Sequence, residues 1–382
     1  MLELVQELCN INSGTHNLQG LEIVKQKLVE EFSELGGQIE LYDVDPLKMV
    51  DDRGEMVEQP LGQLIHITRH VDAPIRIMLC IHMDTVYSMD HPFQTCRLMD
   101  DGNLNGPGVA DAKGGLVVML AALKTLEKSE FAGKIGWEVI INPDEELGSP
   151  GSARFIKQRA AHCDWGLLFE PSLPDGTLVS WRKGTGNFTF VVRGRAAHSG
   201  REFEKGRNAI VALSRLLDQI DRLNVDPEVT LNVGRVSGGG PLNMVPELAI
   251  GRVNVRVKTL SQQSDITDRL QELTDDSNHA DGIHVTMYGG FTSAPKQLDE
   301  RAALLQGRIE RCSKALGQSI QWRGTGGARD GNKFAAAGLA NIDTLGPQGG
   351  NIHSDREYLI TDSLVPCAKR AALILISFAA GI

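Results

Sequence analysis

The sequence lacks the signatures of several protein classes. Its six cysteines are scattered and form no C-x-x-C pair, which argues against a disulfide framework and against a thiolate metal site. Neither G-x-G-x-x-G after a strand nor G-x-x-x-x-G-K-[ST] is present, so nothing supports nucleotide binding. Basic residues are in deficit, because 39 Lys and Arg stand against 49 Asp and Glu. The formal net charge of −10 disfavours a nucleic acid partner.

Segments that would carry the chain into or across a membrane are also missing. The most apolar tail, residues 371–382, is too short for a membrane span, and we interpret it as a terminal helix that faces the core. Residues 2–8 form an amphipathic pattern with acids where a signal peptide carries basic residues. Together with the scattered cysteines, these features predict a cytoplasmic protein in a reducing compartment that contacts no membrane.

The length of 382 residues exceeds what one ordinary hydrophobic core supports, so two domains are expected. In the first part of the chain, apolar strands alternate with helices. This pattern is typical of an α/β fold, in which a mostly parallel sheet is covered by helices on both faces. The expected strands span 75–81, 137–142 and 165–169, with a helix at about 113–127. Ser149 and Pro150, a cap residue followed by proline, predict the start of a further helix.

From about residue 181 the pattern changes to β-α-β-β-α-β. The expected strands are 188–192, 229–236, 249–257 and 283–287, and the expected helices are 208–223 and 266–273. This order makes a complete ferredoxin-like unit of helices on an antiparallel sheet. After residue 295 the first pattern returns. We therefore predict a discontinuous first domain, residues 1–180 and 292–382, with an α+β domain inserted over residues 181–291.

Three consecutive acids, Asp144, Glu145 and Glu146, follow the strand at 137–142. Pro143 ends this strand, so the three carboxylates crowd one strand end. Adjacent carboxylates repel one another and raise each other's pKa, which is unfavourable unless a cation, or a proton needed for chemistry, offsets the repulsion. The stretch therefore indicates a metal site or an acid–base site.

Further imidazoles and carboxylates stand where other strands end. His82 and Asp84 follow the strand at 75–81, and the remaining candidates are Asp111, Glu170 and His353. Because catalytic groups of an open parallel sheet gather beyond the carboxyl ends of its strands, we expect these side chains to meet. Nitrogen and oxygen ligands suit Zn²⁺, and also Co²⁺ or Mn²⁺. The carboxylates are too many for one tetrahedral ion, so the pattern predicts two divalent ions roughly 3.5 to 4 Å apart that share a carboxylate and a water.

Position along the chain suggests roles for some of these residues. His82 and Asp84 are two residues apart on an extended segment, so Asp84 can accept the other ring N–H of His82 and fix its tautomer. Glu145 and Glu146 are adjacent and point in different directions, so one can bind metal while the other stays free as a base. The free acid would take a proton from metal-bound water during attack on a carbonyl and pass it to the leaving nitrogen.

Six motifs appear in order along nearly the whole chain. They read H-M-D-T-V at 82–86, G-P-G-V-A-D-A-K-G-G at 106–115, D-E-E-L-G-S at 144–149, F-E-P-S at 169–172, A-A-H-S-G at 196–200 and G-P-Q-G-G-N-I-H-S-D at 346–355. In these motifs the chain resembles the co-catalytic metal exopeptidases and deacylases. That family includes bacterial glutamate carboxypeptidase, acetylornithine deacetylase, succinyl-diaminopimelate desuccinylase and aminoacylase, and the resemblance leans toward the glutamate carboxypeptidase branch.

The resemblance implies a phosphorylase/hydrolase-like catalytic domain with an inserted lid and dimerisation domain. The implied metal ligands are His82 and Glu170 for one ion, Glu146 and His353 for the other, and Asp111 as the bridge. Glu145 would be the general base acting on a metal-bridging water. In that family a cis peptide bond often follows the bridging aspartate, which here precedes Ala112.

The resemblance also assigns residues outside the ligand set. His198 matches a histidine that reaches into the partner subunit's site in a homodimer and stabilises the oxyanion. Asn243 and Arg256 match positions that hold a substrate carboxylate, a task that suits a planar guanidinium. The Gly-rich turn departs from the family, because Arg329 stands where relatives carry a small hydroxyl residue. The chain has no arginine at 289–291, where the folate-cleaving carboxypeptidase has one nearby, so Arg329 is the candidate to replace that substrate-binding charge.

These patterns predict a hydrolase that cleaves a peptide or N-acyl amide bond next to a free carboxylate in a small substrate, in the manner of glutamate carboxypeptidase. Two alternatives stay open. An N-acyl amino acid deacylase uses the same machinery but recognises the other side of the amide. A metal-binding protein without turnover would share the ligands, although the retained Glu145 argues against it.

Overall fold

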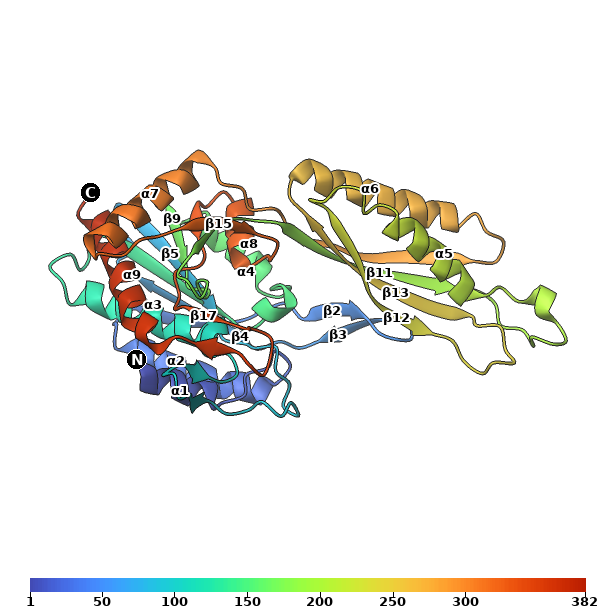
Figure 1. Ribbon diagram of the computed structural model, residues 1–382, viewed down its shortest axis with the longest axis horizontal. Helices are drawn as coiled ribbons and strands as arrows, with labels where there is room; N and C mark the ends of the chain where they lie inside the picture. Colours follow the sequence, from blue (N-terminus) through green and yellow to red (C-terminus); the bar gives the residue numbers. More distant parts are fainter.

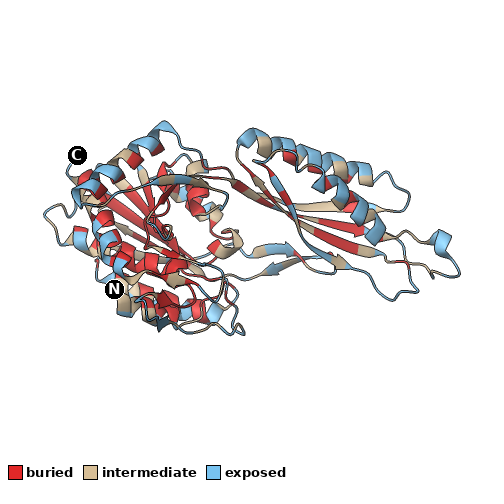
Figure 2. Ribbon diagram, in the orientation of Figure 1, coloured by how far each residue is buried: buried red, intermediate tan, exposed pale blue.

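The computed structural model describes residues 1–382, and its buried apolar side chains form two main cores (Figures 1 and 2). The larger core draws on residues 5–178 and 305–378, whereas the second draws only on residues 188–285. Each core has its own sheet, and the two form separate lobes (Figure 1). The predicted fold class, an α/β unit with an inserted α+β unit, is confirmed. The domain boundaries stay a prediction, which the separation of the cores supports.

The sheet of the first lobe has six strands in the order β1-β4-β8-β5-β9-β16. Their bounds are β1 Gln38–Asp43, β4 Gln63–Arg69, β8 Gly136–Asn142, β5 Arg76–His82, β9 Trp165–Leu168 and β16 Asn341–Ile342. Only β4 runs against the others, because it pairs antiparallel with both β1 and β8. The neighbours β8, β5, β9 and β16 are parallel, so their carboxyl ends lie at the same edge of the sheet.

Helices cover both faces of this sheet. One face packs on α1 (Leu2–Cys9), α2 (Leu18–Ser33), α3 (Gly115–Glu127), α7 (Glu300–Ala315) and α9 (Leu364–Ala379), and the other on α4 (Ala153–Ala160) and α8 (Asp330–Ala336). Successive residues of β5 face opposite layers, since Leu79 packs on the α3 side and Cys80 on the α4 side. The nearly continuous apolar run at 75–81 therefore marks a strand buried on both faces.

Shorter strands complete the first lobe. A four-stranded sheet in the order β17-β18-β7-β6 is formed by Gly349–Gly350, Tyr358–Leu359, Leu104–Asn105 and Arg97–Leu98, and β10 (Leu178–Arg182) pairs in parallel with β15 (Trp322–Thr325). The predicted helix start at Ser149 and Pro150 is wrong, because α4 begins at Ala153. The Ser149 hydroxyl donates a hydrogen bond to Asp330 instead, and the backbone φ of 52° at Ser149 is not helical. None of the helices combines the length and the apolar character that crossing a membrane requires.

The second lobe is the predicted ferredoxin-like unit. Its sheet has the order β12-β13-β11-β14 and is antiparallel throughout. Its elements are β11 Gly184–Arg193, α5 Ala209–Asp221, β12 Thr230–Gly238, β13 Leu248–Val257, α6 Leu260–Ser277 and β14 His284–Ser293. Both helices lie on one face of the sheet (Figure 1). Helix α6 begins before the predicted range 266–273, because a capping box of Thr259 and Gln262 lies at its start. These capping residues are polar, so the apolar periodicity of the sequence does not reveal this start.

A hairpin of the first lobe reaches the face of the second sheet that the helices leave free. It consists of β2 (Leu47–Val50) and β3 (Met56–Gln59). Figure 1 shows the hairpin crossing between the lobes. Val50 packs against Val191 and Ile250 in a small buried cluster, and Asp52 accepts a hydrogen bond from Arg252 at 2.9 Å. The hairpin strands are short and half exposed, so no apolar periodicity marks them in the sequence.

The chain passes between the lobes twice, and the two crossings lie side by side. Arg182 in the first crossing and Lys296 in the second exchange backbone hydrogen bonds of 2.9 and 3.0 Å. Asp343, which follows β16, accepts a hydrogen bond from Nε of Arg182 at 2.8 Å and from Nζ of Lys296 at 2.8 Å. All three side chains are buried. One carboxylate therefore fastens both crossings to the edge of the first sheet.

Replacement of Asp343 with Asn is expected to lower the free energy of unfolding by about 3 to 5 kcal/mol, because it leaves two buried cations without their counter-charge. Burial alone raises the pKa of the Asp343 carboxyl, but Arg182 and Lys296 outweigh burial and hold this pKa below its usual range. The stabilisation is therefore complete at neutral pH and shrinks as the pH falls below about 4, the ordinary pKa of aspartate.

Urea unfolding of both proteins between about pH 3 and pH 7 measures this difference and its pH dependence. Asp72→Asn, in an exposed loop, is the matched control and should change the free energy by less than about 0.5 kcal/mol. Equal effects of the two substitutions would contradict the clamp at Asp343.

Candidate metal centre

The carboxyl ends of β5, β8 and β9 are neighbours in the sheet, and the segments after them carry candidate ligands. His82 ends β5, Glu146 lies in a short helical turn after β8, and Glu170 follows β9. Asp111 comes from the segment before α3, and His353 comes from the loop between β17 and β18. Five segments that are distant in the sequence thus bring these side chains to one edge of the sheet.

Two groups of side chains have the spacing of metal ligands, and Asp111 belongs to both. Nε2 of His82 lies 3.1 Å from Oδ1 of Asp111 and 3.8 Å from Oε1 of Glu170. Nε2 of His353 lies 3.2 Å from Oδ2 of Asp111 and 3.2 Å from Oε2 of Glu146. Ligand atoms about 2.0 to 2.2 Å from a tetrahedral Zn²⁺ are about 3.3 to 3.6 Å apart. Both groups therefore fit a divalent ion.

Asp84 fixes the orientation of two of the ligand-bearing segments. Nδ1 of His82, on the side of the ring away from the ligand nitrogen, lies 3.0 Å from the backbone carbonyl oxygen of Asp84 and 3.2 Å from its Oδ1. The same carboxylate accepts the N–H of Glu145 at 3.1 Å, the N–H of Glu146 at 3.2 Å and the hydroxyl of Thr15 at 2.6 Å. Asp84 therefore joins the imidazole to the turn that carries the two glutamates.

A second buried carboxylate, Glu357, organises the segment that carries Asp111. It accepts the backbone N–H of Ala110 at 3.0 Å, that of Asp111 at 3.1 Å, and the Tyr87 hydroxyl at 2.8 Å. The peptide bond that follows Asp111 is cis, in agreement with the expectation from the family resemblance. Sequence analysis missed Glu357. An acid four residues after His353, just beyond the last motif, is the signal that could have identified it.

Crowding and burial shift the ionisation of the cluster. Burial, and then the charge of Asp111, raise the pKa of Glu146 to about 7. Burial also raises the pKa of Glu145, and it raises that of Glu170 well above the usual range. Hydrogen bonds to Asp111 and Glu146 raise the pKa of His353 to about 10. Crowded, buried carboxylates with raised pKa values are a favourable setting for a divalent ion, because its charge would stabilise their ionised forms.

Arg329 enters the cluster from the Gly-rich turn before α8. Its Nη2 lies 2.6 Å from Oδ2 of Asp111, its Nη1 lies 3.1 Å from Oε2 of Glu145, and its Nε lies 3.4 Å from Oε2 of Glu170. Only 12% of the side chain is exposed. Each guanidinium nitrogen of Arg329 faces a carboxylate of the protein, and the residue also lines the cleft, so its role in substrate binding stays a prediction.

The placement of Arg329 depends on a contact that sequence analysis also missed. Asp330 begins α8, is buried, and accepts a hydrogen bond from Asn142 at the end of β8 at 2.8 Å. Ser149 donates to the other oxygen of Asp330. These contacts tie α8 to the strand end beside the two glutamates. The Asp-Gly pair at 330–331 reads as an ordinary turn in the sequence, so only the tertiary contact reveals its role.

A cleft of about 470 Å³ opens beside the cluster, with walls from both lobes. Glu145, Glu146 and His353 line it from the first lobe, and Arg256 lines it from β13 of the second. Arg256 donates from Nε to the Asn254 side chain at 3.0 Å and from Nη1 to a backbone carbonyl of the Gly-rich turn at 3.3 Å. No acidic side chain pairs with its guanidinium.

His198 and Asn243 lie at the far end of the second lobe. Strand β11 starts at the cleft and ends at Arg193, and ten residues in a strand span about 33 Å. His198 is exposed in the loop that follows, and the carbonyl of Asn243 accepts the N–H of the neighbouring Ser199 at 2.9 Å. The structure therefore does not bring His198 or Asn243 to the ligand cluster of the same chain.

The fold and the ligand cluster together define a hydrolase of the metallopeptidase class. The sequence model of peptidase family M20/M25/M40 matches residues 78–377. The chain belongs to this family.

Individual relatives agree with this assignment. Carboxypeptidase G2 of Pseudomonas sp. (strain RS-16) is 26% identical over 378 residues, which cover 96% of this chain and 86% of that protein. The M20 family metallo-carboxypeptidase Sso-CP2 of Sulfolobus solfataricus superimposes with a TM-score of 0.76 at 16% identity, covering 99% of each chain. The YXEP protein of Bacillus subtilis, a dinuclear metal-binding peptidase, superimposes with a TM-score of 0.69 at 13% identity, covering 100% of this chain and 98% of the other. Both of these solved structures share the fold of this chain.

Replacement of Asp84 with Asn is expected to weaken metal binding by about 10- to 100-fold. The amide puts an N–H group against donors that the carboxylate now accepts, so the turn at 145–147 loses its fixed orientation, while His82 keeps only the backbone carbonyl of residue 84 as a partner. Titration of the metal-free protein with Zn²⁺ against a competing chelator measures the change. Asp100→Asn, in an exposed turn, is the control and should bind like the wild type. Unchanged affinity in Asp84→Asn would remove its orienting role.

Proposed function

We propose that the protein is a glutamate-carboxypeptidase-like hydrolase that cleaves an amide bond next to a free carboxylate. The position of Glu145 carries the proposal. Glu145 lines the cleft beside the cluster, and its carboxylate belongs to neither group of ligand atoms. A buried acid beside a metal site, but outside the ligand set, is suited to transfer protons. The name and the sequence similarity of carboxypeptidase G2 support the same reading.

The proposed centre holds two divalent ions, with zinc preferred over cobalt or manganese. Its ligands would be His82 and Glu170 for one ion, Glu146 and His353 for the other, and Asp111 for both. When bound, the ions would polarise the amide carbonyl as Lewis acids and lower the pKa of water at the site. The spacing within the two ligand groups supports this arrangement, as does the dinuclear character of the YXEP protein.

Glu145 and Asp84 would have separate roles in the reaction. Glu145 would accept a proton from the attacking water and return it to the leaving nitrogen. Burial raises its pKa, which suits a group that must both take up and release a proton. Asp84 would keep the His82 ring in one tautomer, so that Nε2 faces the metal position.

Arg256 would hold the substrate carboxylate. It lines the cleft, it is half buried, and no acidic side chain neutralises its charge. A guanidinium in such a position can form two parallel hydrogen bonds to a carboxylate. The same residue supports the alternative activity, N-acyl amino acid deacylation, because the carboxylate of an acylated amino acid would also reach it. Asn243 lies too far from this cleft to serve the same chain.

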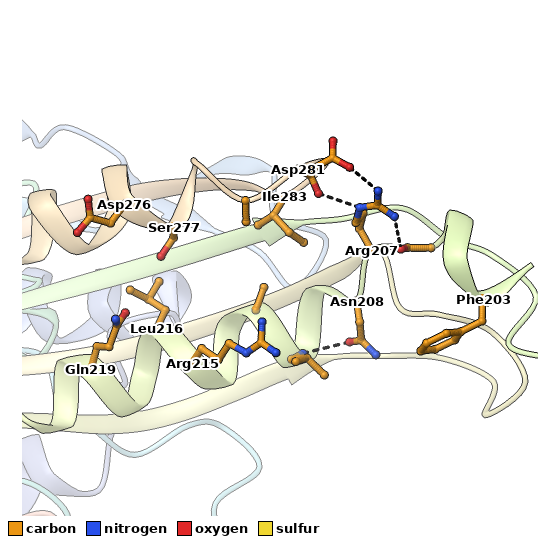
Figure 3. A pocket seen from close by; sticks show the side chains of 14 residues that line it. Phe203, Arg207, Asn208, Arg215, Leu216, Gln219, Asp276, Ser277, Asp281 and Ile283 are labelled. Atoms are coloured by element: carbon orange, nitrogen blue, oxygen red, sulfur yellow. Dashed lines mark hydrogen bonds and ion pairs between the residues drawn. The ribbon is translucent and has the colours of Figure 1, made fainter.

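A homodimer formed through the second lobe would bring His198 and Asn243 to the site of the partner subunit. Large apolar side chains are exposed around the loops that carry them, with exposed fractions of 63% for Phe203 and 102% for Leu242. Figure 3 shows Phe203 beside a hollow of about 490 Å³ between α5 and the end of α6. A second copy of the chain would cover this apolar surface. We also propose a cytoplasmic location, as the cysteine pattern of the sequence predicts.

Replacement of Glu145 with Gln is expected to reduce kcat by about 10² to 10⁴ while the metal content stays unchanged, because the base is lost but no ligand is. Glu146→Gln is the matched comparison and should lower the metal content, since Glu146 lies within the ligand groups. The assay uses metal-loaded protein and a panel of C-terminal glutamyl peptides, their amide-capped counterparts and N-acyl amino acids.

Hydrolysis of the glutamyl peptides but not of the capped ones is the expected result for the wild type. Turnover of N-acyl amino acids alone would select the deacylase, and no turnover on any substrate would leave a metal-binding protein. Full activity in Glu145→Gln would contradict the proposed mechanism.

Mixing two inactive variants tests the role of His198 across the dimer. His198→Ala and Glu145→Gln are each expected to be inactive alone. A heterodimer of the two has one site that combines a normal Glu145 with a normal His198 from the partner subunit. Mixed and re-equilibrated subunits should therefore recover about a quarter of the wild-type activity. Size-exclusion chromatography verifies the dimer, and no recovery despite subunit exchange would exclude the shared site.

A further inference from the structure

A second hollow lies beside the ligand cluster, and no step of the proposed reaction uses it. Its volume is about 460 Å³, which falls within the roughly 300 to 1,000 Å³ of small-molecule sites. Two loops and one turn of the first lobe form it, namely the loop 14–17 between α1 and α2, the loop 85–89 after β5, and Glu146 with Leu147. The hollow therefore opens at the same strand ends as the candidate metal ligands.

The hollow and the cleft meet at the turn that carries the two glutamates. Glu146 and Leu147 line both of them, whereas Glu145 and Arg256 line only the cleft. In the proposed reaction Glu145 returns a proton to the leaving nitrogen, and Arg256 holds the carboxylate of the leaving amino acid. The leaving part of the substrate therefore lies in the cleft. The acyl part extends from the metal centre on the other side of Glu146, toward the hollow.

Most of the surface exposed in this hollow is apolar. Val86 and Met89 have exposed fractions of 42% and 67%, and Leu147 is partly exposed where the hollow meets the cleft. Apart from Glu146, no acidic residue, lysine or arginine lines the hollow, so a charged acyl group would find no partner of opposite charge unless it were basic. Exposed apolar side chains beside a binding site are typical of a surface that a ligand covers, and methionine adapts to the shape of an apolar partner.

Contacts with the metal centre hold the hollow in place. The Thr15 hydroxyl donates to Asp84 at 2.6 Å, and the N–H of Thr15 donates to the carbonyl of Thr85 at 3.2 Å, which joins the two loops. A Cβ atom at Gly14 would lie 2.2 Å from the carbonyl oxygen of Tyr87, so only glycine permits this close approach of the loops. The hollow is therefore preformed, and it is fixed to the carboxylate that orients the candidate ligands.

We propose that this hollow binds the acyl part of the substrate, and that the protein prefers long apolar acyl groups to acetyl. The acyl chain passes Glu146 and lies against Val86, Met89 and Leu147. An acetyl group leaves these side chains in water, whereas a longer chain buries them and binds more tightly. This inference rests on the proposed function, because that function assigns the cleft to the leaving amino acid.

A series of N-acyl-L-glutamates with acetyl, butanoyl, hexanoyl and octanoyl groups tests the proposal. For each compound kcat/KM is measured in the metal-loaded wild type, and Kd is measured by calorimetry in metal-loaded Glu145→Gln, which should bind without cleaving. Each methylene that enters the hollow should lower Kd up to about fourfold, so the hexanoyl compound should bind at least about tenfold more tightly than the acetyl compound. The value of kcat/KM should rise in the same order.

Val86→Thr combined with Met89→Gln makes the hollow more polar with little change in side-chain size. In this double variant the advantage of hexanoyl over acetyl should fall below about threefold, while binding of the acetyl compound stays within about twofold of its original value. Val71→Thr combined with Met99→Gln is the matched control, because both residues are exposed and neither lines the hollow. The control should keep the full advantage of the longer chain.

Equal affinity for acetyl and hexanoyl compounds, or an undiminished advantage in the double variant, would overturn the proposal. If the double variant does not fold, His16→Trp decides, because a bulky ring at this exposed lining residue should block long acyl groups and spare acetyl. An unchanged preference in His16→Trp would then refute the inference. Tighter binding of long acyl groups without hydrolysis would reject the proposed function alone, hydrolysis that is independent of acyl length would reject this inference alone, and the absence of binding and hydrolysis would reject both.

Discussion

Repulsion among buried carboxylates governs how the first lobe is built around the ends of β5, β8 and β9. Asp84, Asp111, Glu145, Glu146 and Glu170 all lie at this edge of the sheet and are largely buried. Each ionised carboxylate that is buried away from water costs about several kcal/mol unless nearby charges or hydrogen bonds compensate it. The surrounding segments are therefore arranged to supply positive charge and N–H donors, and the carboxylates that remain uncompensated make the cluster a candidate site for divalent ions.

Backbone N–H groups provide much of the compensation that does not come from cations. Asp84 accepts those of Glu145 and Glu146, and Glu357 accepts those of Ala110 and Asp111. These donors are fixed in the turns after β8 and before α3, so the carboxylates hold the turns in place while the turns stabilise the carboxylates. The candidate metal ligands are thus positioned by groups outside the ligand set.

The Gly-rich turn and α8 connect this centre to the junction between the lobes. Arg329 reaches the carboxylates, while the side chain of Asn332, three residues later, donates to the carbonyls of Lys183 at 3.1 Å and Ala294 at 2.7 Å. Those two carbonyls belong to the two chain crossings. Arg256 of the second lobe donates to the same turn. The Gly-rich turn and α8 therefore join the carboxylate cluster, the two crossings and the cleft wall through direct contacts.

Local patterns in the sequence determined the fold class, the strands that end at the site and the residue types that gather there. Strand β5 was predicted at 75–81 and lies at Arg76–His82, because a strand buried on both faces carries an apolar run that needs no knowledge of its neighbours. The tertiary structure alone decided the contacts between distant segments. Ser149 bonds to Asp330 instead of capping a helix, and Arg329 contacts carboxylates of the protein while it also lines the cleft. These contacts form between segments that are distant in the sequence, after the sheet and α8 have packed. Residue spacing along the chain therefore does not predict them.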